Sequence, residues 1–424
     1  MNNHCGYVVE IKQLRPHNNA DKLQIATFFN SDTCVSLEAK IGDIGIYFPS
    51  DLQLGLNFCV KNHLLRKTPE GKEDTGYLEA NRHVRAIKLR GEKSDGIYLP
   101  ISCLGEFGDI STLKVGDTID IFNGHEICKK YIPHEYKLRS TKSKEVNKKK
   151  VNKAKMYPQF CEHIDTPQLR FCMSAFQPGD TICLTEKVHG TSARHGLTLV
   201  KKNDNWFTRL FKLNKNKYEY ITGTRRTIVN NNSDGGFYGT HAFRLKWAEA
   251  FKDKLHPGEE IFGEIAGFLE DGTPIMARGQ NKKTNDKAFI KKFGDITTFS
   301  SGCKENENKF FIYRMTYTSP EGYCIEYSWD QVKARAEEMG FNVVPELDRF
   351  IYTTEDDFIQ RISKWLDIPS TIDSTHIIEG VVVRALNKPG FAVAKEKSYN
   401  FKVIEGIIKA EAEAPDMEEA EDLV

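Results

Sequence analysis

Residues 184–194 read Leu184-Thr185-Glu186-Lys187-Val188-His189-Gly190-Thr191-Ser192-Ala193-Arg194, with a lysine three residues before a glycine. The preceding segment, 180–185, is typical of a strand, which places Lys187 where a strand gives way to a turn. The neutral amine of a lysine is a nucleophile, and lysine is a known covalent catalyst. Because this spacing of lysine and glycine is common by chance, its meaning depends on the rest of the chain.

The chain has 424 residues, enough for two or three domains, and its 39% hydrophobic and 28% charged content is typical of a globular protein. A net charge of +1 gives no global attraction to nucleic acid, so basic residues must be clustered if they bind it. No run of 18 apolar residues indicates a membrane span. The ten cysteines are scattered without a C-x-x-C pair, and the N-terminus has no signal-peptide pattern. We therefore expect no zinc site and a cytoplasmic location.

Short segments typical of strands fill residues 6–130, which predicts a small antiparallel barrel of the OB type. The stretch His17-Asn-Asn-Ala-Asp-Lys-Leu resembles the H-P-N-A-D-K-L turn of tRNA-binding OB-fold modules. The stretch Leu89-Arg-Gly-Glu-Lys-Ser-Asp-Gly-Ile resembles the L-R-G-x-x-S-x-G segment in the N-terminal domain of one RNA ligase family. We therefore expect an OB-like nucleic-acid-binding domain at 1–134. The alternative is a barrel that only packs on its neighbour.

The composition changes after this domain. Residues 135–157 are rich in lysine and nearly without apolar residues, which predicts a flexible basic linker. Such a linker could add salt-dependent affinity for nucleic acid, or it could simply be solvated. Residues 158–408 mix strand patterns with helices expected at 242–251 and 329–340, the second ended by a glycine. The acidic residues of 409–424 predict a disordered tail.

Four further motifs follow Lys187 in the second domain: Thr224-Arg-Arg-Thr-Ile-Val, Glu260-Ile-Phe-Gly-Glu-Ile-Ala-Gly, Lys309-Phe-Phe-Ile-Tyr-Arg, and Ile377-Ile-Glu-Gly-Val-Val-Val-Arg. A lysine-bearing segment at 391–404, which we expect to be a strand, comes last. This series resembles the ordered motifs of the covalent nucleotidyltransferases, the polynucleotide ligases and mRNA capping enzymes. The form E-K-x-H-G-T-S resembles RNA ligases, because DNA ligases and capping enzymes usually carry K-x-D-G.

The resemblance implies an α+β fold. An N-terminal OB-like β-barrel would precede a nucleotidyltransferase (ATP-grasp-like ligase) domain with antiparallel sheets and helices. It also implies an ATP-dependent RNA ligase that joins RNA 3′-OH and 5′-phosphate ends, at nicks in duplexes, through a lysyl-AMP and an AMP-capped 5′-end. The expected cofactors are ATP and Mg²⁺ or Mn²⁺. The expected partner is RNA or an RNA-containing duplex. We expect the protein to be a monomer and to have no membrane partner.

The same resemblance assigns roles to residues of the central motifs. Lys187 is the expected nucleophile that attacks the α-phosphate of ATP. Glu264 is expected to hold the ribose, and Glu379 to position the metal, with Glu264 as a second metal ligand. Phe310 is expected to stack on adenine. Phe311 is the alternative, because it lies on the opposite face of the same strand.

Further residues are expected to contact the nucleotide or the RNA. Glu186 lies beside the nucleophile, and His189 is expected near the β- and γ-phosphates or the metal. Arg225 or Arg226 would bind the ribose or the RNA 5′-phosphate, because an arginine fork suits both. Gly190 would let the backbone approach the nucleotide closely.

The final motif is open between two assignments. Lys395 and Lys397 form a K-x-K pair on one strand face, whereas Lys402 matches the F-K-V-I form of similar ligases. If the strand continued to Lys402, its side chain would have the opposite parity, so one strand could not aim all three at one phosphate. We favour Lys395 and Lys397, with Lys402 as the alternative nucleotide contact.

The sequence departs from the pattern of the ligases in two places, and three alternative functions stay open. Residues 201–217 look like a basic, aromatic insertion that could touch RNA or cap a sheet edge, and little chain follows the last motif. The alternatives are a ligase for DNA or for single-strand and tRNA breaks, a capping-type guanylyltransferase, and an inactive RNA-binding module.

Overall fold

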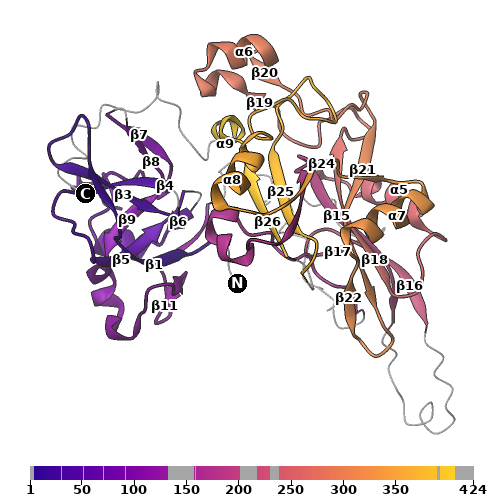
Figure 1. Ribbon diagram of the computed structural model, residues 1–424, viewed down its shortest axis with the longest axis horizontal. Coiled ribbons are helices and arrows are strands. Elements are labelled where there is room, and N and C mark those ends of the chain that lie inside the picture. Colours follow the sequence, from indigo (N-terminus) through magenta and orange to yellow (C-terminus); the bar gives the residue numbers. More distant parts are fainter. Residues whose placement is uncertain are drawn as a thin grey trace, which may run out of the picture. The chain divides into compact units, whose positions relative to one another are not determined.

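The computed structural model describes residues 4–29, 31–50, 52–69, 71–90, 92–131, 157, 159–200, 217–229, 238–388 and 392–405 (Figure 1). The basic linker and acidic tail expected at 135–157 and 409–424, and the insertion at 201–217, lie outside these residues except for Tyr157 and Lys217. The chain divides into two compact units. The first contains Met1–His134, Gln280–Asp295 and Lys402–Val424, and the second contains Glu135–Gly279 and Ile296–Phe401.

The first unit is built from short antiparallel strands and one α-helix of its N-terminal part, α1 (Leu56–Lys61). The strands are β1 (Gly6–Glu10), β2 (Leu14–Pro16), β3 (Leu23–Phe28), β4 (Ser31–Ser36), β5 (Ile44–Phe48), β6 (Leu52–Leu54), β7 (Ile87–Leu89), β8 (Glu92–Ser94), β9 (Ile97–Pro100), β10 (Thr118–Ile119), β11 (Ile121–Phe122), β12 (His125–Glu126) and β13 (Cys128–Lys130). They form the sheets β10-β1-β5-β9 and β2-β3-β4 and the pairs β13-β6, β7-β8 and β11-β12. Phe48, Phe58 and Leu104 lie at the centre of its core.

The expected OB barrel is not confirmed, because no closed barrel occurs among the described residues. The sheet β2-β3-β4 meets the neighbouring strands through isolated bonds instead of a continuous ladder. The amide of Asp95 donates to the carbonyl of Asp32 at 2.8 Å, and the amide of Cys34 donates to Ser94 Oγ at 3.0 Å. The sequence pattern therefore predicted the strands but not how they associate.

Two segments that the sequence singled out lie side by side in this unit. The buried His17 ring donates through Nε2 to the carbonyl of Leu89 at 3.2 Å. The amide side chain of Asn19 donates to the carbonyl of Arg90 at 2.9 Å. The turn after β2 and the β7–β8 turn are thus tied together, although about 70 residues separate them.

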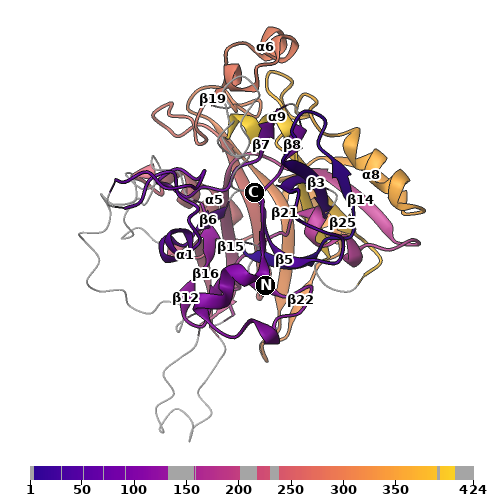
Figure 2. The same ribbon diagram turned by 90° about the vertical axis from the view of Figure 1, so that its left-hand side faces the viewer.

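The second unit contains two sheets. The smaller has the order β24-β14-β25-β26, from β14 (Thr181–Glu186), β24 (Glu346–Ile351), β25 (Gly380–Ala385) and β26 (Val393–Lys397). The larger has the order β17-β16-β15-β18-β21-β22, from β15 (Thr191–Leu199), β16 (Tyr218–Gly223), β17 (Ile228–Val229), β18 (Glu259–Gly267), β21 (Asn308–Thr318) and β22 (Cys324–Glu326). The short β23 (Asn342–Val343) pairs with β21 in parallel. The long strands β16, β15, β18 and β21 lie side by side in this order, and Figure 2 labels β15, β16 and β21 among them.

Helices cover one face of each sheet. The helices α5 (Ala242–Phe251) and α7 (Trp329–Met339) pack on the larger sheet, and α8 (Glu355–Ser363) packs on the smaller one. Along β14, Ile182 and Leu184 point to α8, while Cys183 between them joins the core of the larger sheet. Because side chains alternate along a strand, one face of β14 is directed at the larger sheet.

The remaining elements complete the chain. Strands β19 (Gly279–Gln280) and β20 (Ile296–Thr297) flank α6 (Lys287–Phe293), and α9 (Tyr399–Ile404) follows β26. Short 3-10 helices occur at Ile101–Phe107, Ile110–Thr112, Leu169–Phe171, Met173–Ala175 and Asn281–Thr284. No helix among the described residues is long and apolar enough to span a membrane.

Both predicted helices are confirmed, and the predicted strand at 391–404 is wrong in its second half. Helix α7 begins with a capping box of Ser328 and Gln331 and ends at Gly340, which is left-handed at φ 77°. Strand β26 ends at Lys397, and α9 then begins at Tyr399. The carboxylate of Asp367 accepts from the amides of Tyr399 and Asn400 at 3.2 and 2.8 Å, which stabilises the start of this helix.

Candidate active site

Lys187 follows directly on the last residue of β14, as predicted. Both its backbone amide and its side-chain amine contact residues 379–380, where β25 begins. Its amide donates to the carbonyl of Gly380 at 2.9 Å. Its Nζ lies 2.7 Å from Oε1 of Glu379, and the lysine side chain is 25% exposed. The side chain of Lys187 is therefore partly exposed, and its amine is directed at Glu379.

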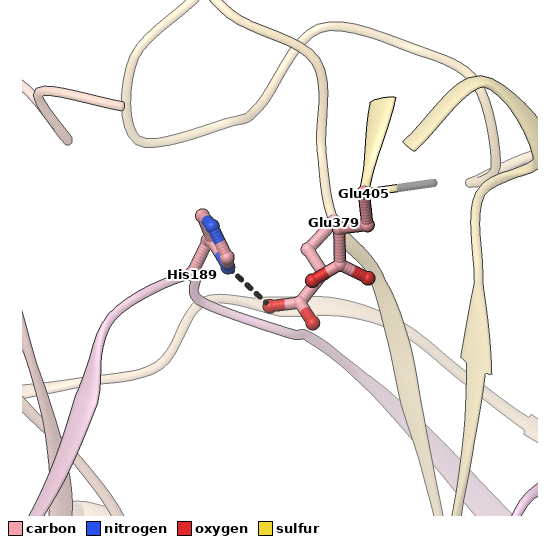
Figure 3. A group of neighbouring side chains, drawn as sticks. All are labelled: His189, Glu379 and Glu405. Atoms are coloured by element: carbon pink, nitrogen blue, oxygen red, sulfur yellow. Dashed lines mark hydrogen bonds and ion pairs between the residues drawn. The ribbon is translucent and has the colours of Figure 1, made fainter. Parts of the chain in front are cut away.

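Glu379 is the centre of the site because three cationic or donor groups converge on its carboxylate. Besides Lys187, the Nζ of Lys397 lies 3.2 Å from Oε1. The Nδ1 of His189 lies 3.3 Å from Oε2, and a dashed line marks this contact in Figure 3. Burial alone would raise the pKa of Glu379, but the two lysines and the histidine outweigh it, so the pKa lies well below its ordinary value. The carboxylate is therefore ionised at neutral pH.

Two glycines allow this convergence. A Cβ on Gly380, whose φ is 154°, would lie 2.1 Å from the carbonyl oxygen of Glu396, so only glycine lets β26 come close enough for Lys397 to reach Glu379. A Cβ on Gly190 would lie 2.3 Å from the carbonyl oxygen of Ile265. In the structure Gly190 thus allows a close approach to the backbone of β18, and its approach to a nucleotide stays a prediction.

His189 is held by aromatic rings as well as by Glu379. The rings of Phe299 and Phe401 pack edge-on against its imidazole, with centroids at 4.6 and 4.7 Å. The Nζ of Lys397 lies 5.4 Å from the centre of the Phe401 ring. Phe401 therefore contacts two of the three groups that surround Glu379.

Glu186 points away from this cluster. Its buried carboxylate accepts from Ser370 Oγ at 2.5 Å and from the amide of Thr371 at 2.9 Å. Because neighbouring residues of a strand face opposite sides, Glu186 lies across the sheet from Lys187. The structure thus assigns Glu186 to anchoring the segment at 370–371, and the predicted contact with a nucleotide is corrected.

Glu264 lies on β18, on the face shared with Ser192 of β15. The two residues are direct partners in the ladder, and Ser192 Oγ donates to Glu264 Oε2 at 3.1 Å. Burial raises the pKa of Glu264 to about 7, although Lys187 and the hydrogen bond from Ser192 oppose the rise. The two predicted carboxylates thus differ in protonation, because Glu379 stays charged and Glu264 titrates near neutrality.

The strand β21 turns Phe310 away from Glu264, so the predicted stacking of Phe310 on a base is corrected. Phe310 is 1% exposed and packs against Trp247 and Phe251 of α5, with centroids at 5.7 and 5.0 Å. In the ladder Glu264 pairs with Phe311, which places these two side chains on one face. The alternative residue, Phe311, therefore lies on the face of the site.

Arg225 and Arg226 lie in the turn after β16 (Tyr218–Gly223), and both contact one carboxylate. The guanidinium groups of Arg225 and Arg226 pair with Asp165, the second at 3.3 Å. The side chain of Arg225 is 43% exposed and that of Arg226 is 70% exposed. The positive charge of Arg225 also lowers the pKa of Glu264, so Arg225 is the arginine nearer to the site.

Of the three lysines of the final motif, the structure brings Lys397 to Glu379. Lys395 pairs with Val382 in the ladder and lies on the same face of β26 as Lys397. Lys402 lies on α9 instead of a strand, so our comparison of strand parity does not apply to it. The strand that carries the pair ends before Lys402 because Asp367 caps the helix that follows.

Sequence reasoning missed four residues that organise the site. Asp165 holds both arginines, and Ser192 holds Glu264. Arg384 donates to the carbonyl of Tyr313 at 2.9 Å and thereby links β25 to β21 across the two sheets. Burial lowers the pKa of the Arg384 guanidinium to about 10. Arg384 is the last residue of the motif at 377–384, and Tyr313 lies in the motif at 309–314, which was the available signal for both.

The model of the RNA ligase family matches residues 180–404, which is more than half of the chain and includes every element of the cluster around Glu379. The protein belongs to the RNA ligase family.

Solved structures agree with this family at the level of the fold. The chain is similar to a Naegleria gruberi RNA ligase with pyrophosphate, at TM-score 0.59 and 16% identity, covering 94% of this chain and 97% of that chain. A variant of that ligase with ATP and Mn gives TM-score 0.58 and 16% identity, over 93% and 97% of the two chains. Another variant with AMP and Mn gives TM-score 0.55 and 15% identity, covering 93% of this chain and 96% of that chain. A comparison with curated protein sequences finds no match.

Proposed function

We propose that this member of the RNA ligase family is an ATP-dependent ligase that joins an RNA 3′-OH to a 5′-phosphate through a lysyl-AMP at Lys187. The observation that carries the proposal is the partly exposed Lys187 side chain, whose amine is held 2.7 Å from the ionised, buried Glu379. The ATP and Mn in the similar Naegleria gruberi structures support the choice of nucleotide and metal. Nicks in duplexes are the proposed substrate, because the sequence resembles nick-sealing ligases.

In the first step, the Lys187 ammonium gives one proton to solvent, and the lone pair of the neutral Nζ then attacks the α-phosphorus of ATP. The bond to the β-phosphate oxygen breaks, pyrophosphate leaves with that electron pair, and Nζ loses its proton. In the second step, a 5′-phosphate oxygen of the RNA attacks the same phosphorus and frees Lys187. In the third step, the 3′-oxygen attacks the 5′-phosphate and gives its proton to solvent, while the phosphoanhydride bond breaks and AMP leaves with that electron pair. All three are displacements at phosphorus, in which positioned cations stabilise the developing charge.

The other residues position the reactants. Lys397, with Lys395 beside it, would neutralise the α-phosphate. Glu264 would accept hydrogen bonds from the ribose, and Phe311 would replace Phe310 as the ring that stacks on adenine. Arg225 and Arg226 would exchange Asp165 for the ribose or the RNA 5′-phosphate. His189 would contact the terminal phosphates, and Lys402 stays an alternative contact.

The donor set fits a magnesium or manganese ion. Glu379 is ionised and offers the oxygen ligands that both ions prefer, with Glu264 as a second proposed ligand. When bound, such an ion would stabilise negative charge on the phosphates. The OB-like role of residues 1–134 in binding RNA, the monomeric state and the cytoplasmic location belong to the same proposal.

Labelling with nucleotide tests this function. The protein is incubated with magnesium and α-labelled ATP or GTP, denatured, and compared with Lys187→Ala. We expect label from ATP that is lost in the variant. Label from GTP alone would indicate a capping-type enzyme. No label on protein shown by intact mass to carry no AMP would favour an inactive RNA-binding module.

The polynucleotide is tested separately, with nicked duplexes whose 3′-OH strand is RNA or DNA and with cut single-stranded loops. Sealing of the nick with an RNA 3′-OH strand is expected. Faster sealing of the DNA nick or of the cut loop would replace the nick-sealing RNA ligase by one of those alternatives.

A further inference from the structure

Two cysteine thiols of the second unit are in contact, although 163 positions separate them in the sequence. The Sγ atoms of Cys161 and Cys324 lie 3.9 Å apart. Cys324 is exposed and Cys161 is half-buried, so a small reagent can reach the pair from solvent. The two sulfur atoms of a disulfide lie about 2.05 Å apart, so closing the gap asks for a shift of about 1 Å by each sulfur.

The backbone of Cys161 is held against the larger sheet. Its amide donates to Glu260 Oε2 at 2.8 Å, and its carbonyl accepts from the Arg194 guanidinium. Two residues earlier, Gln159 Nε2 donates to the carbonyl of Pro320 at 3.2 Å, in the turn between β21 and β22. This segment is therefore attached to the same turn that leads to the second thiol.

Cys324 is fixed as the first residue of β22. It pairs with Thr318 of β21 in the antiparallel ladder, and β22 is the terminal strand in the order of the larger sheet. Its thiol therefore lies at a sheet edge. The backbones of both cysteines are positioned by hydrogen bonds in which neither thiol takes part, so the pair is held together before any bond forms between the sulfur atoms.

The two thiols differ in their reactivity toward an external disulfide. The thiolate is the nucleophile in such an exchange, so exposure and thiolate content decide which sulfur reacts first. Burial, together with the charge of Glu260, raises the pKa of the Cys161 thiol to about 12, which leaves little thiolate near pH 7. The exposed Cys324 is therefore expected to react first and Cys161 second.

We propose that Cys161 and Cys324 form a redox-sensitive modification site, which becomes a disulfide by exchange with a low-molecular-weight disulfide. The Cys324 thiolate attacks one sulfur of the reagent, the reagent's S–S bond breaks, and one small thiol leaves with that electron pair and the proton that Cys324 lost. The Cys161 sulfur then gives up its proton and attacks Cys324 Sγ, and the second small thiol leaves with the electron pair and that proton. Two protein thiols are thereby oxidised, and one small disulfide is reduced to two thiols.

The new bond would fasten the segment that leads from Cys161 to Asp165. Between them, the amide of His163 donates to the carbonyl of Arg225 at 3.3 Å. Asp165 itself pairs with Arg225 and Arg226. Oxidation would therefore tie the turn that carries both arginines, through this segment, to β22. Under reducing conditions such a bond is transient, as for other disulfides that respond to oxidation.

The test incubates the native full-length protein with glutathione disulfide, unfolds it in the presence of iodoacetamide, and counts the alkylated thiols by intact mass. We expect the count to fall by two from the ten cysteines of the chain, and to return to ten after treatment with a reducing dithiol. Peptide mapping should assign the bond to Cys161 and Cys324. Loss of these two thiols should be complete when less than about a tenth of each buried cysteine has reacted.

Single serine variants test the order of attack. Cys161→Ser should keep a glutathione adduct on Cys324, because the second thiol is missing. Cys324→Ser should leave Cys161 reduced. The matched control is Cys172→Ser, which removes another half-buried thiol whose pKa burial raises to about 11. The Cys172 thiol donates to the carbonyl of Gln168 at 3.3 Å and not to a second thiol, so this variant should oxidise like the wild type.

A full count of ten thiols after the incubation would overturn the inference, as would a lasting glutathione adduct on Cys324 of the wild-type protein. A bond that mapping assigns to another pair of cysteines would overturn it too. Mapping of the wild-type protein decides the question even if a variant fails to fold. None of these measurements uses nucleotide or RNA, so this inference and the ligase proposal stand or fall separately.

Discussion

Lys187 and Glu379 form an ion pair of 2.7 Å, although 192 positions separate them in the sequence. The backbone repeats the link, since the amide of Lys187 donates to the residue that follows Glu379. This double attachment sets the direction of the amine. Four predictions follow from the groups around it.

Glu379→Gln should abolish adduct formation and reduce stability. The change keeps the size of the side chain but leaves Lys187 and Lys397 without their counter-ion. We expect the adduct rate to fall at least about 100-fold, and the free energy of unfolding to fall by about 1–3 kcal/mol. A labelled-ATP assay and urea unfolding measure the two effects.

The matched control is Glu346→Gln, which removes a carboxylate that also accepts from a lysine and an arginine, Lys333 and Arg349. It should lose stability but keep the adduct rate. Wild-type adduct levels in Glu379→Gln at ordinary magnesium would remove our assignment of Glu379.

Glu264→Gln should gain stability over the wild type as pH rises. The folded pKa of Glu264 is raised to about 7, so between pH 4.5 and 7 the unfolded chain is ionised while the folded carboxyl still holds its proton. Stability from this group is therefore lost as pH rises through that window, and glutamine does not share the loss. We expect the difference in unfolding free energy to shift by on the order of 1–3 kcal/mol between pH 5 and 8.

Urea unfolding at four pH values from 5 to 8 measures this shift. Glu346→Gln again serves as the control, because the pKa of Glu346 is lowered to about 2 and the group is ionised in both states over this range. Its difference from the wild type should stay constant. A constant difference for Glu264→Gln as well would contradict a raised pKa at Glu264.

Phe311→Leu and Phe310→Leu should separate nucleotide binding from packing. Both rings are buried, so each change should cost about 1–3 kcal/mol of stability. Only Phe311→Leu should raise KM for ATP, by about threefold to tenfold, because Phe311 shares the face of Glu264. Steady-state adduct formation gives KM, and a larger KM effect in Phe310→Leu would restore our original choice.

Lys397→Met and Lys395→Met should differ in the rate of the chemical step. Methionine keeps much of the length but not the charge, and Lys397 is the lysine that contacts Glu379 at 3.2 Å. We expect a fall of about 100-fold for Lys397→Met and a smaller one for Lys395→Met. Single-turnover mixing with saturating ATP measures both rates, and the reverse order would assign the α-phosphate contact to Lys395.

The sequence predicted those parts of the site that depend on local pattern. The helix at 242–251 and the helix that ends at Gly340 follow from periodicity and a glycine stop. Lys187, Glu264 and Glu379 were found because they stand in the ordered motif series that resembles the covalent nucleotidyltransferases. These residues do meet on two facing sheets.

The rest depends on contacts that no local pattern contains. Strand β21 is apolar on both faces, so alternation could not decide between Phe310 and Phe311. The end of β26 is set by Asp367, which caps α9 from 32 positions away. The pairing of Asp165 with two arginines is likewise a long-range contact.

The ratio of charges around Glu379 changes during the proposed reaction. Before it, two ammonium groups face one carboxylate, and the surplus positive charge attracts a triphosphate. Once Lys187 carries the nucleotide, its nitrogen is no longer an ammonium, and Lys397 and Glu379 balance each other. The net positive charge of these three side chains therefore falls by one at the moment when pyrophosphate must depart, which would weaken their hold on that product.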